Sequence, residues 1–262
     1  NSTLASALAA KKLNIPIAHV ESGLRSFDSS MPEEINRVIT DHISDILFVT
    51  EQSGLDNLHK EGLFNKEILF VGNSMIDSLK SFLPISLQKK PWEEYNLETG
   101  NYVLVTFHRP SNVDNKKNLE LIIQLLNKIS VETKIIFPVH PRTLKKLDQL
   151  GTKLSEKINL IPPLSYLNFL GLMAKAKIVI TDSGGIQEET SYLNVQCITY
   201  RKNTERPITI SSGTNHLAGC NKDALKIFNK IMLGDIKRKE NIPKWDGMAG
   251  RRIAKFIKKQ LS

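Results

Sequence analysis

Cysteines, aromatic residues and long apolar runs are all scarce in this sequence of 262 residues. Two cysteines, Cys197 and Cys220, are too few for a disulfide framework and favour a reducing compartment. No apolar run reaches the roughly 18 residues that a membrane helix needs, and the first residues show no signal-peptide pattern. The sequence therefore predicts a cytoplasmic protein without a membrane partner.

Several motifs of metal and nucleophile chemistry are also missing. The sequence has no HExxH, no CxxC pair, no EF-hand loop and no GxSxG elbow, so it predicts no metal site. The net charge is +9, but the Lys and Arg residues are scattered, with the densest run at Lys237–Lys239. A solvated basic face explains this pattern better than a nucleic-acid-binding stripe, and we expect no nucleic-acid partner.

What recurs instead is a short apolar run rich in Ile, Val and Leu. Helical patterns such as NLELIIQLLNKI separate these runs, and the alternation predicts an α/β fold with parallel sheets and crossover helices. The expected strands are residues 15–20, 45–50, 67–72, 102–107, 134–139, 158–163, 177–181 and 195–200.

A domain boundary is expected within residues 81–100, where two prolines, a Lys pair and a Gly interrupt the periodicity. Residues 1–80 then form a first domain with three strands, too few for a doubly wound domain, and residues 81–247 form a second. The tail helix, residues 248–262, is expected to pack back on the first domain. A helix that opens the chain and feeds a parallel sheet suggests an incomplete first domain with a segment upstream.

Polar residues follow the expected strands at their carboxyl ends, where open parallel sheets bind ligands. In HVESGLRSFDSSMPEEINR, Glu21 leaves the first strand, and Glu33 and Glu34 fall in the first turn of a helix that continues to Arg37. The helix dipole alone favours acidic residues in a first turn. Glu21 has no such explanation and is a candidate acid or base.

Two histidines follow later strands together with arginines. His108 and Arg109 come after residues 102–107, and His140 and Arg142 come after residues 134–139. Each pair can contact an anion near neutral pH. A structural histidine and a simple strand-to-helix turn are the alternatives.

The segment TDSGGIQEE, residues 181–189, is the most informative. A predicted strand ends and a predicted helix begins at Ser183, Gly184 and Gly185. Backbone N–H groups and the helix dipole at such a junction favour the binding of a phosphate. Glu189, in the next turn, suits ribose hydroxyls better. The residues alone thus indicate two α/β domains, a phosphate-bearing ligand and acid–base groups from both domains.

The ordered set HVESGLRS, PEEINR, GN at 72–73, TFHRPSNVD, PVHP, TDSGGIQEE and TERP resembles the non-hydrolysing UDP-N-acetylglucosamine 2-epimerases. The resemblance spans nearly the whole chain. It implies two Rossmann-like domains in the GT-B arrangement, a homodimer, and no metal or nicotinamide cofactor. It also implies UDP-N-acetylglucosamine and UDP as partners, and C2 epimerisation to UDP-N-acetylmannosamine through UDP elimination and re-addition.

The resemblance also assigns roles to residues. It implies Glu21 and Glu33 as the acid–base carboxylates and His108 beside the departing diphosphate. The expected substrate-binding residues are Arg109, Ser183, Gly184, Gly185, Glu189 and Arg206. Glu34, Arg37 and His140 are candidates for a second, activating UDP-N-acetylglucosamine site.

Family members begin with a strand, a basic UDP contact and a catalytic Asp that have no counterpart from Asn1 onward. The resemblance therefore implies an N-terminal truncation and little epimerase activity for residues 1–262 alone. Two alternatives share the expected phosphate site: a GT-B glycosyltransferase that uses a UDP-sugar and needs an acceptor, and a non-catalytic module that binds a UDP-sugar.

Overall fold

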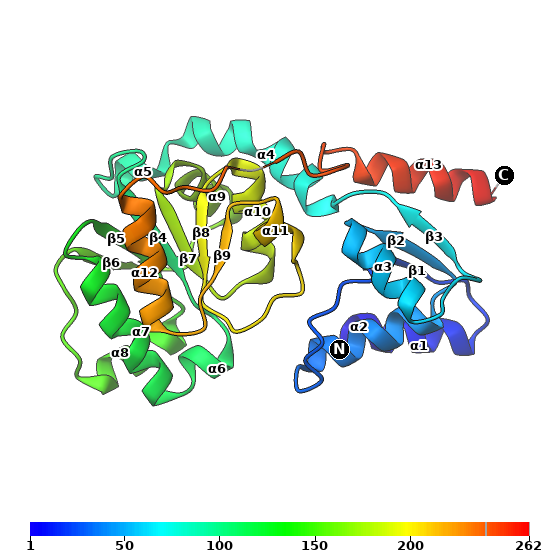
Figure 1. The fold of residues 1–262 in the computed structure, drawn as a ribbon, viewed down its shortest axis with the longest axis horizontal. Helices are drawn as coiled ribbons and strands as arrows, with labels where there is room; N and C mark the ends of the chain where they lie inside the picture. The colour runs from blue at the N-terminus through cyan, green and yellow to red at the C-terminus, as the bar shows by residue number, and fades with distance from the viewer. Residues whose placement is uncertain (239, 262) are drawn as a thin grey trace. The chain divides into compact units, whose positions relative to one another are not determined.

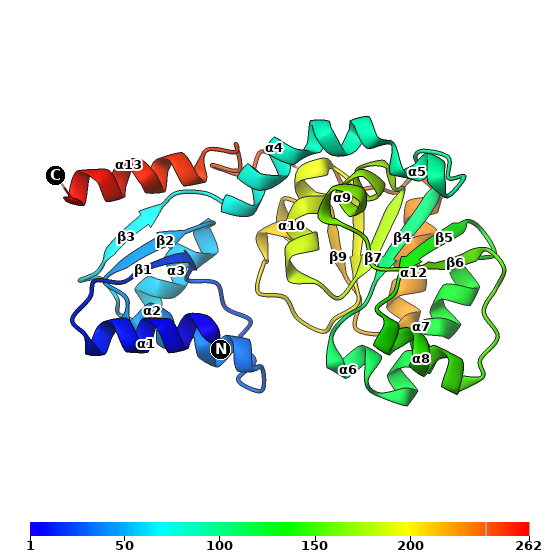
Figure 2. The same ribbon diagram turned by 180° about the vertical axis from the view of Figure 1, so that it is seen from behind.

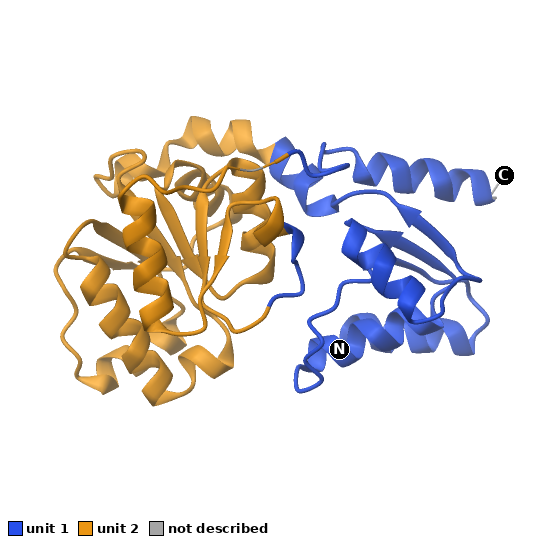
Figure 3. Cartoon of the chain, in the orientation of Figure 1, with its two compact units in different colours: residues 1–81, 204–208, 241–262 blue, residues 82–203, 209–240 orange. Residues whose placement is uncertain are grey.

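A computed structural model describes residues 1–238 and 240–261 of the chain. The chain forms two compact units, coloured in Figure 3. Unit 1 consists of residues 1–81, 204–208 and 241–262, and unit 2 of residues 82–203 and 209–240. The path of the chain through both units is shown in Figures 1 and 2. Among the described residues, no helix has the length and apolar character needed to cross a membrane.

Unit 1 is built on a three-stranded parallel sheet in the order β1-β2-β3. The central strand β2 is buried, and its side chains pack with those of α3 around Leu47, Val49 and Leu58. The elements of this unit are β1 (Ala18–Ser22), β2 (Ile46–Val49), β3 (Glu67–Phe70), α1 (Ser2–Lys12), α2 (Pro32–Ile43), α3 (Gln52–Lys60), the first half of α4 (Ser74–Lys89) and α13 (Ala249–Leu261).

The C-terminal helix α13 packs on the N-terminal part of the chain within unit 1, where it contacts α4 and β2. The Asp77 carboxylate on α4 accepts hydrogen bonds from the backbone N–H groups of Ala249 (3.1 Å) and Gly250 (2.7 Å), which begin α13. Phe256 on α13 packs edge-to-face on Phe48 of β2, with ring centroids 5.7 Å apart. An acidic side chain at a helix start and an apolar face on the sheet together explain why α13 packs here.

Unit 2 is a doubly wound α/β domain with a six-stranded parallel sheet in the order β6-β5-β4-β7-β8-β9. Helices α7, α8 and α12 cover one face, and α9 and α10 cover the other (Figures 1 and 2). Its elements are β4 (Tyr102–Thr106), β5 (Lys134–Pro138), β6 (Ile158–Ile161), β7 (Ile178–Thr181), β8 (Gln196–Thr199), β9 (Asn215–Leu217), α5 (Pro91–Glu94), α6 (Pro110–Val113), α7 (Lys116–Ile129), α8 (Pro141–Leu150), α9 (Tyr166–Lys175), α10 (Gly184–Leu193), α11 (Ile208–Ser211) and α12 (Asn221–Met232).

The strand order places one topological switch in unit 2. From β4 the chain moves outward through β5 to β6, then returns to β7 on the other side of β4 and continues outward to β9. The carboxyl ends of β4 and β7 are therefore neighbours from which the chain departs in opposite directions. In open parallel sheets this is where a ligand-binding crevice forms.

Each of the eight expected strands overlaps one of β1 to β8. The sequence missed β9, because three residues containing Asn215 and His216 carry no apolar run. The segment 81–100 is also more regular than its prolines suggested. Helix α4 runs through Pro84 to Lys89, and α5 follows directly.

Candidate functional site

The switch point of unit 2 carries a buried carboxylate. Thr106 at the end of β4 pairs with Thr181 at the end of β7, and Asp182 is the next residue. The Asp182 side chain is fully buried. It accepts hydrogen bonds from the backbone N–H of His108 (3.2 Å) and of Arg109 (3.0 Å), and from Nδ2 of Asn112 (2.9 Å).

Asp182 also orients the His108 ring. The Nδ1 atom of His108 lies 2.9 Å from Oδ1 of Asp182, and the His108 side chain is 61% exposed. With Nδ1 donating to the carboxylate, Nε2 is the nitrogen that remains for a ligand. Burial acts to raise the pKa of Asp182, but the hydrogen bonds from His108, Asn112 and Arg109 hold it below its usual value. The carboxylate therefore stays charged and fixes the loop after β4.

Asp182 connects the loop that follows β4 to the start of α10, because it bonds to His108 and Arg109 and directly precedes Ser183. Ser183 occupies the N-cap position with no side-chain cap bond, and Gly184 and Gly185 open the helix. The Arg109 side chain donates from Nε to the backbone oxygen of Asp182 (3.0 Å). Unit 2 therefore brings His108 and Arg109 to the start of α10. Backbone N–H groups and the positive end of the α10 dipole favour an anion there.

Glu189 lies one turn further along α10. It is buried, and its Oε1 accepts a hydrogen bond from the Tyr166 hydroxyl (2.9 Å). Burial raises the pKa of Glu189, although the Tyr166 hydrogen bond acts in the opposite direction.

His140 caps α8 at the end of the neighbouring strand β5. Its Nδ1 accepts a hydrogen bond from the backbone N–H of Arg142 (3.3 Å), and the Arg142 side chain pairs with Asp114 (2.9 Å). These contacts give His140 and Arg142 structural roles at a strand-to-helix turn. A ligand contact by His140 stays a prediction.

In unit 1, Glu21 lies at an irregular point of β1. Its φ is +66°, in the left-handed region, and the pairing of β1 with β2 shifts between Val20 and Ser22. Few residues other than glycine adopt this conformation, and it commonly marks strained functional positions. A one-residue bulge of this kind re-aims a side chain at the end of a strand.

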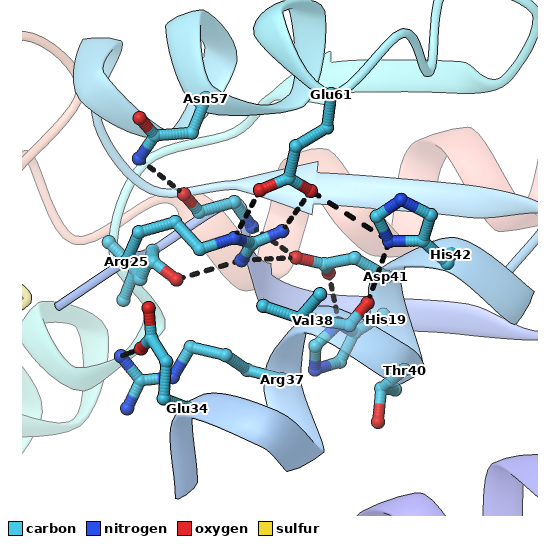
Figure 4. A network of polar contacts seen from close by, with 12 residues as sticks. His19, Arg25, Glu34, Arg37, Val38, Thr40, Asp41, His42, Asn57 and Glu61 are labelled. Carbon is cyan, nitrogen blue, oxygen red and sulfur yellow. Dashed lines mark hydrogen bonds and ion pairs between the residues drawn. The ribbon is translucent and has the colours of Figure 1, made fainter. Parts of the chain in front are cut away.

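Glu34 and Glu33 differ sharply in their surroundings. The Glu34 carboxylate is buried and accepts hydrogen bonds from the backbone N–H groups of Ser26 (3.0 Å) and Phe27 (2.9 Å). It also pairs with Arg37 (3.2 Å), as Figure 4 shows. Glu34 thus holds the loop between β1 and α2, whereas Glu33 is exposed.

Arg206 belongs to the segment 204–208 of unit 1 and lies among charged groups. Its Nη1 contacts Oε1 of Glu205 (2.6 Å), and its charge acts on both Glu51 and Arg37. Burial raises the pKa of Glu51 to about 7, although the hydrogen bond from Ser53 and the charge of Arg206 act to lower it. Burial lowers the pKa of Arg37, against the opposing charges of Glu205 and Glu34.

Sequence reasoning left several buried carboxylates out of the candidate residues. Asp182 directly follows β7, and Glu51 comes two residues after the end of β2, so the strand-end rule could have selected both. Asp41 lies within α2, and only the folded structure reveals its contacts. No cluster of three or more His, Cys, Asp or Glu side chains that could hold a metal ion occurs in the described part of the chain.

Each unit is built on a parallel sheet with helices packed on it, and polar residues follow its strands, so the protein belongs to the Rossmann-like α/β class. A sequence model described as UDP-N-acetylglucosamine 2-epimerase matches residues 1–258. The chain belongs to the UDP-N-acetylglucosamine 2-epimerase family. The family and the fold class expected from the sequence are both confirmed.

Individual relatives are similar over nearly the whole chain. A UDP-N-acetylglucosamine 2-epimerase of Methanococcus maripaludis is 44% identical, with 98% of this chain and 72% of the relative covered. A UDP-2,3-diacetamido-2,3-dideoxy-D-glucuronate 2-epimerase of Pseudomonas aeruginosa is 38% identical, with 99% and 72% covered. The crystal structure of the Methanocaldococcus jannaschii UDP-GlcNAc 2-epimerase in complex with UDP-GlcNAc and UDP matches with a TM-score of 0.88 and 44% identity, covering 98% of this chain and 72% of that one.

Proposed function

We propose that the protein interconverts UDP-N-acetylglucosamine and UDP-N-acetylmannosamine. The observation that carries this proposal is the Asp182 carboxylate, which holds His108 and Arg109 beside the start of α10. This arrangement suits a diphosphate that must leave and return. Family membership supports the same reaction.

The reaction needs a base, an acid and a stable leaving group. A base removes the C2 proton, the C1–oxygen bond to UDP breaks with its electron pair on UDP, and a 2-acetamidoglucal remains. UDP then adds back at C1 while a proton returns to C2 on the opposite face. Because the C2 proton is not acidic, the base must be held at contact distance and the charge on UDP must be stabilised.

The proposed roles follow the chemistry of each side chain. Glu21 and Glu33 handle the C2 proton. His108, Arg109 and the helix start at Ser183, Gly184 and Gly185 stabilise the diphosphate. Glu189 holds the ribose, and Arg206 contacts UDP or the sugar. Glu34, Arg37 and His140 are proposed for an activating second nucleotide-sugar, although Glu34 and His140 already serve structural contacts.

The assembly and domain organisation are proposals as well. We propose a cytoplasmic homodimer that binds UDP-N-acetylglucosamine and UDP. The proposed first Rossmann-like domain comprises residues 1–80 with the tail helix 248–262, and the proposed second comprises residues 81–247, although the segments 204–208 and 241–247 group with compact unit 1. The contacts of Asp77 with the start of α13 support this grouping of the tail helix.

The test is turnover without an acceptor. The full-length gene product containing residues 1–262 is incubated with UDP-N-acetylglucosamine alone, and the nucleotide-sugars are followed by NMR. We expect UDP-N-acetylmannosamine to form and the reverse reaction to reach the same equilibrium mixture.

The other outcomes select other functions. Turnover only after a sugar or polyol acceptor is added would identify a glycosyltransferase, and binding without conversion would identify a nucleotide-sugar binding module. A parallel sample with UDP-2,3-diacetamido-2,3-dideoxy-D-glucuronate tests the substrate of the Pseudomonas aeruginosa relative. Conversion of that sugar alone would overturn the proposed substrate but not the epimerase class.

A further inference from the structure

The strained backbone at Glu21 needs support from its surroundings. A residue other than glycine is energetically unfavourable in the left-handed region and persists there only when neighbouring structure enforces the conformation. Glu21 has this conformation at the end of β1. The question is which groups hold the chain there.

The Asp41 carboxylate forms hydrogen bonds with residues on both sides of Glu21 in the sequence. Its Oδ1 lies 2.6 Å from Nδ1 of His19, two residues before Glu21. Its Oδ2 accepts a hydrogen bond from the backbone N–H of Gly23 (3.0 Å), two residues after Glu21. One side chain of α2 therefore fixes both ends of the irregular segment of β1, as Figure 4 shows for its labelled members.

Asp41 is itself held in place by a second layer of charges. Its side chain is fully buried, and its Oδ2 lies 2.7 Å from Nη1 of Arg25. Arg25 makes two further bonds to the Glu61 carboxylate, from Nε (2.6 Å) and Nη2 (2.7 Å). Burial acts to lower the pKa of Arg25, but Glu61 and Asp41 outweigh it and raise that pKa. Paired, buried charges of this kind form a rigid network whose parts are costly to remove singly.

Gly23 is fixed from other sides too. Its carbonyl accepts a hydrogen bond from Nδ2 of Asn57 on α3 (2.9 Å). Its φ is +82°, and a Cβ added there would lie 2.4 Å from the carbonyl oxygen of Gly54. The backbone at Gly23, just after β1, therefore has little freedom to change conformation if the hydrogen bonds of Asp41 are lost.

We propose that Asp41 is a positioning residue for Glu21, and this inference rests on the acid–base role proposed above for Glu21. Asp41 touches no substrate in this account. It sets the direction in which the Glu21 carboxylate leaves the strand, and Arg25 and Asn57 keep it from shifting. A misplacement of about 1 Å can cost on the order of a hundredfold in rate.

The experiment compares Asp41→Asn with Asp45→Asn in the full-length gene product. Asp45 is the matched control, because it holds the other end of the same strand through the backbone N–H of Ile17 (2.9 Å) and pairs with Lys11 (2.5 Å). We expect Asp41→Asn to lower kcat about tenfold to a hundredfold with KM changed less than about threefold. Asp45→Asn should keep kcat within about twofold of the wild type.

A double-mutant cycle with Glu21→Gln then separates positioning from general damage. If Asp41 acts through Glu21, adding Asp41→Asn to Glu21→Gln lowers the residual kcat no further. An equal loss in both backgrounds would overturn the inference, and so would a folded Asp41→Asn protein with normal kcat. Normal turnover by Glu21→Gln would instead overturn the role proposed for Glu21, so the two failures are distinguishable.

A milder variant covers the case in which Asp41→Asn does not fold. Asn57→Ala removes the hydrogen bond to the Gly23 carbonyl and leaves the ion pairs of Asp41 intact. We expect a smaller loss of kcat in the same direction, again absent in the Glu21→Gln background. A normal kcat for folded Asn57→Ala, with Asp41→Asn unfolded, would leave Asp41 a purely structural residue and overturn the inference.

Discussion

Replacing Asp182 with Asn tests how unit 2 builds its ligand site. The substitution keeps the size of the side chain but removes its charge and presents an amide N–H₂ group to hydrogen-bond donors. The groups affected are the backbone N–H groups of His108 and Arg109, the Asn112 amide and the His108 ring. We expect both the stability of unit 2 and its affinity for UDP to fall.

The magnitude follows from the number and burial of these contacts. Hydrogen bonds to a charged group contribute about 1.5–3 kcal/mol each, and a buried donor left without a partner costs about 1–3 kcal/mol. Because the contacts share one carboxylate and the amide keeps one acceptor oxygen, these values do not simply add, and we expect the free energy of unfolding to fall by about 3–5 kcal/mol. For a domain of this size, that lowers the unfolding temperature by roughly 6–20 °C.

Thermal unfolding and titration calorimetry with UDP measure the two effects. Asp114→Asn is the control, because Asp114 pairs with Arg142 and Lys146 on the surface, where ion pairs contribute little. It should unfold near the wild-type temperature and bind UDP normally. An Asp182→Asn protein that unfolds and binds UDP like the wild type would refute the role given to this carboxylate.

Three further substitutions test other parts of the structure. The folded state holds a proton on Glu51 up to about pH 7, whereas the unfolded state holds it only up to about pH 4.5. The free energy of unfolding should therefore decrease as the pH rises from about 4.5 to about 7. Glu51→Gln should lack this fall, which is worth about 3 kcal/mol, in urea unfolding at a series of pH values. Gly23→Ala should destabilise the protein more than Gly62→Ala, since both glycines have positive φ but only Gly23 has atoms in the way of a Cβ; equal unfolding temperatures would contradict this. Tyr166→Phe removes the hydrogen bond to buried Glu189 and should lower the free energy of unfolding by about 1–3 kcal/mol, whereas unchanged stability would mean that the bond contributes nothing.

The sequence predicted the fold class and eight strands because apolar runs of β-branched residues mark buried parallel strands directly. It also predicted that His108 and Ser183 lie at strand ends, since each follows such a run. It missed β9, whose backbone pairs without an apolar side-chain pattern. The helix through Pro84 was missed because a proline usually ends a helical pattern.

The contacts within the site depend on long-range pairing, which spacing along the chain does not reveal. Asp182 is 74 residues from His108, and they meet because β7 returns to the side of β4. Asp41 and Glu34 both lie on α2 among acidic and basic residues, and nothing in the sequence distinguishes these two buried carboxylates from exposed Glu33. The left-handed conformation of Glu21 was equally hidden, because no glycine marks it.

Proton exchange at C2 tests the proposed reaction most directly. The full-length gene product is incubated with UDP-N-acetylglucosamine in D₂O, and the product is examined by NMR and mass spectrometry. If a carboxylate removes the C2 proton and solvent exchanges with it, UDP-N-acetylmannosamine will carry deuterium at C2. UDP-N-acetylmannosamine that forms with hydrogen retained at C2 would contradict the proposed transfer of the C2 proton to an exchanging carboxylate.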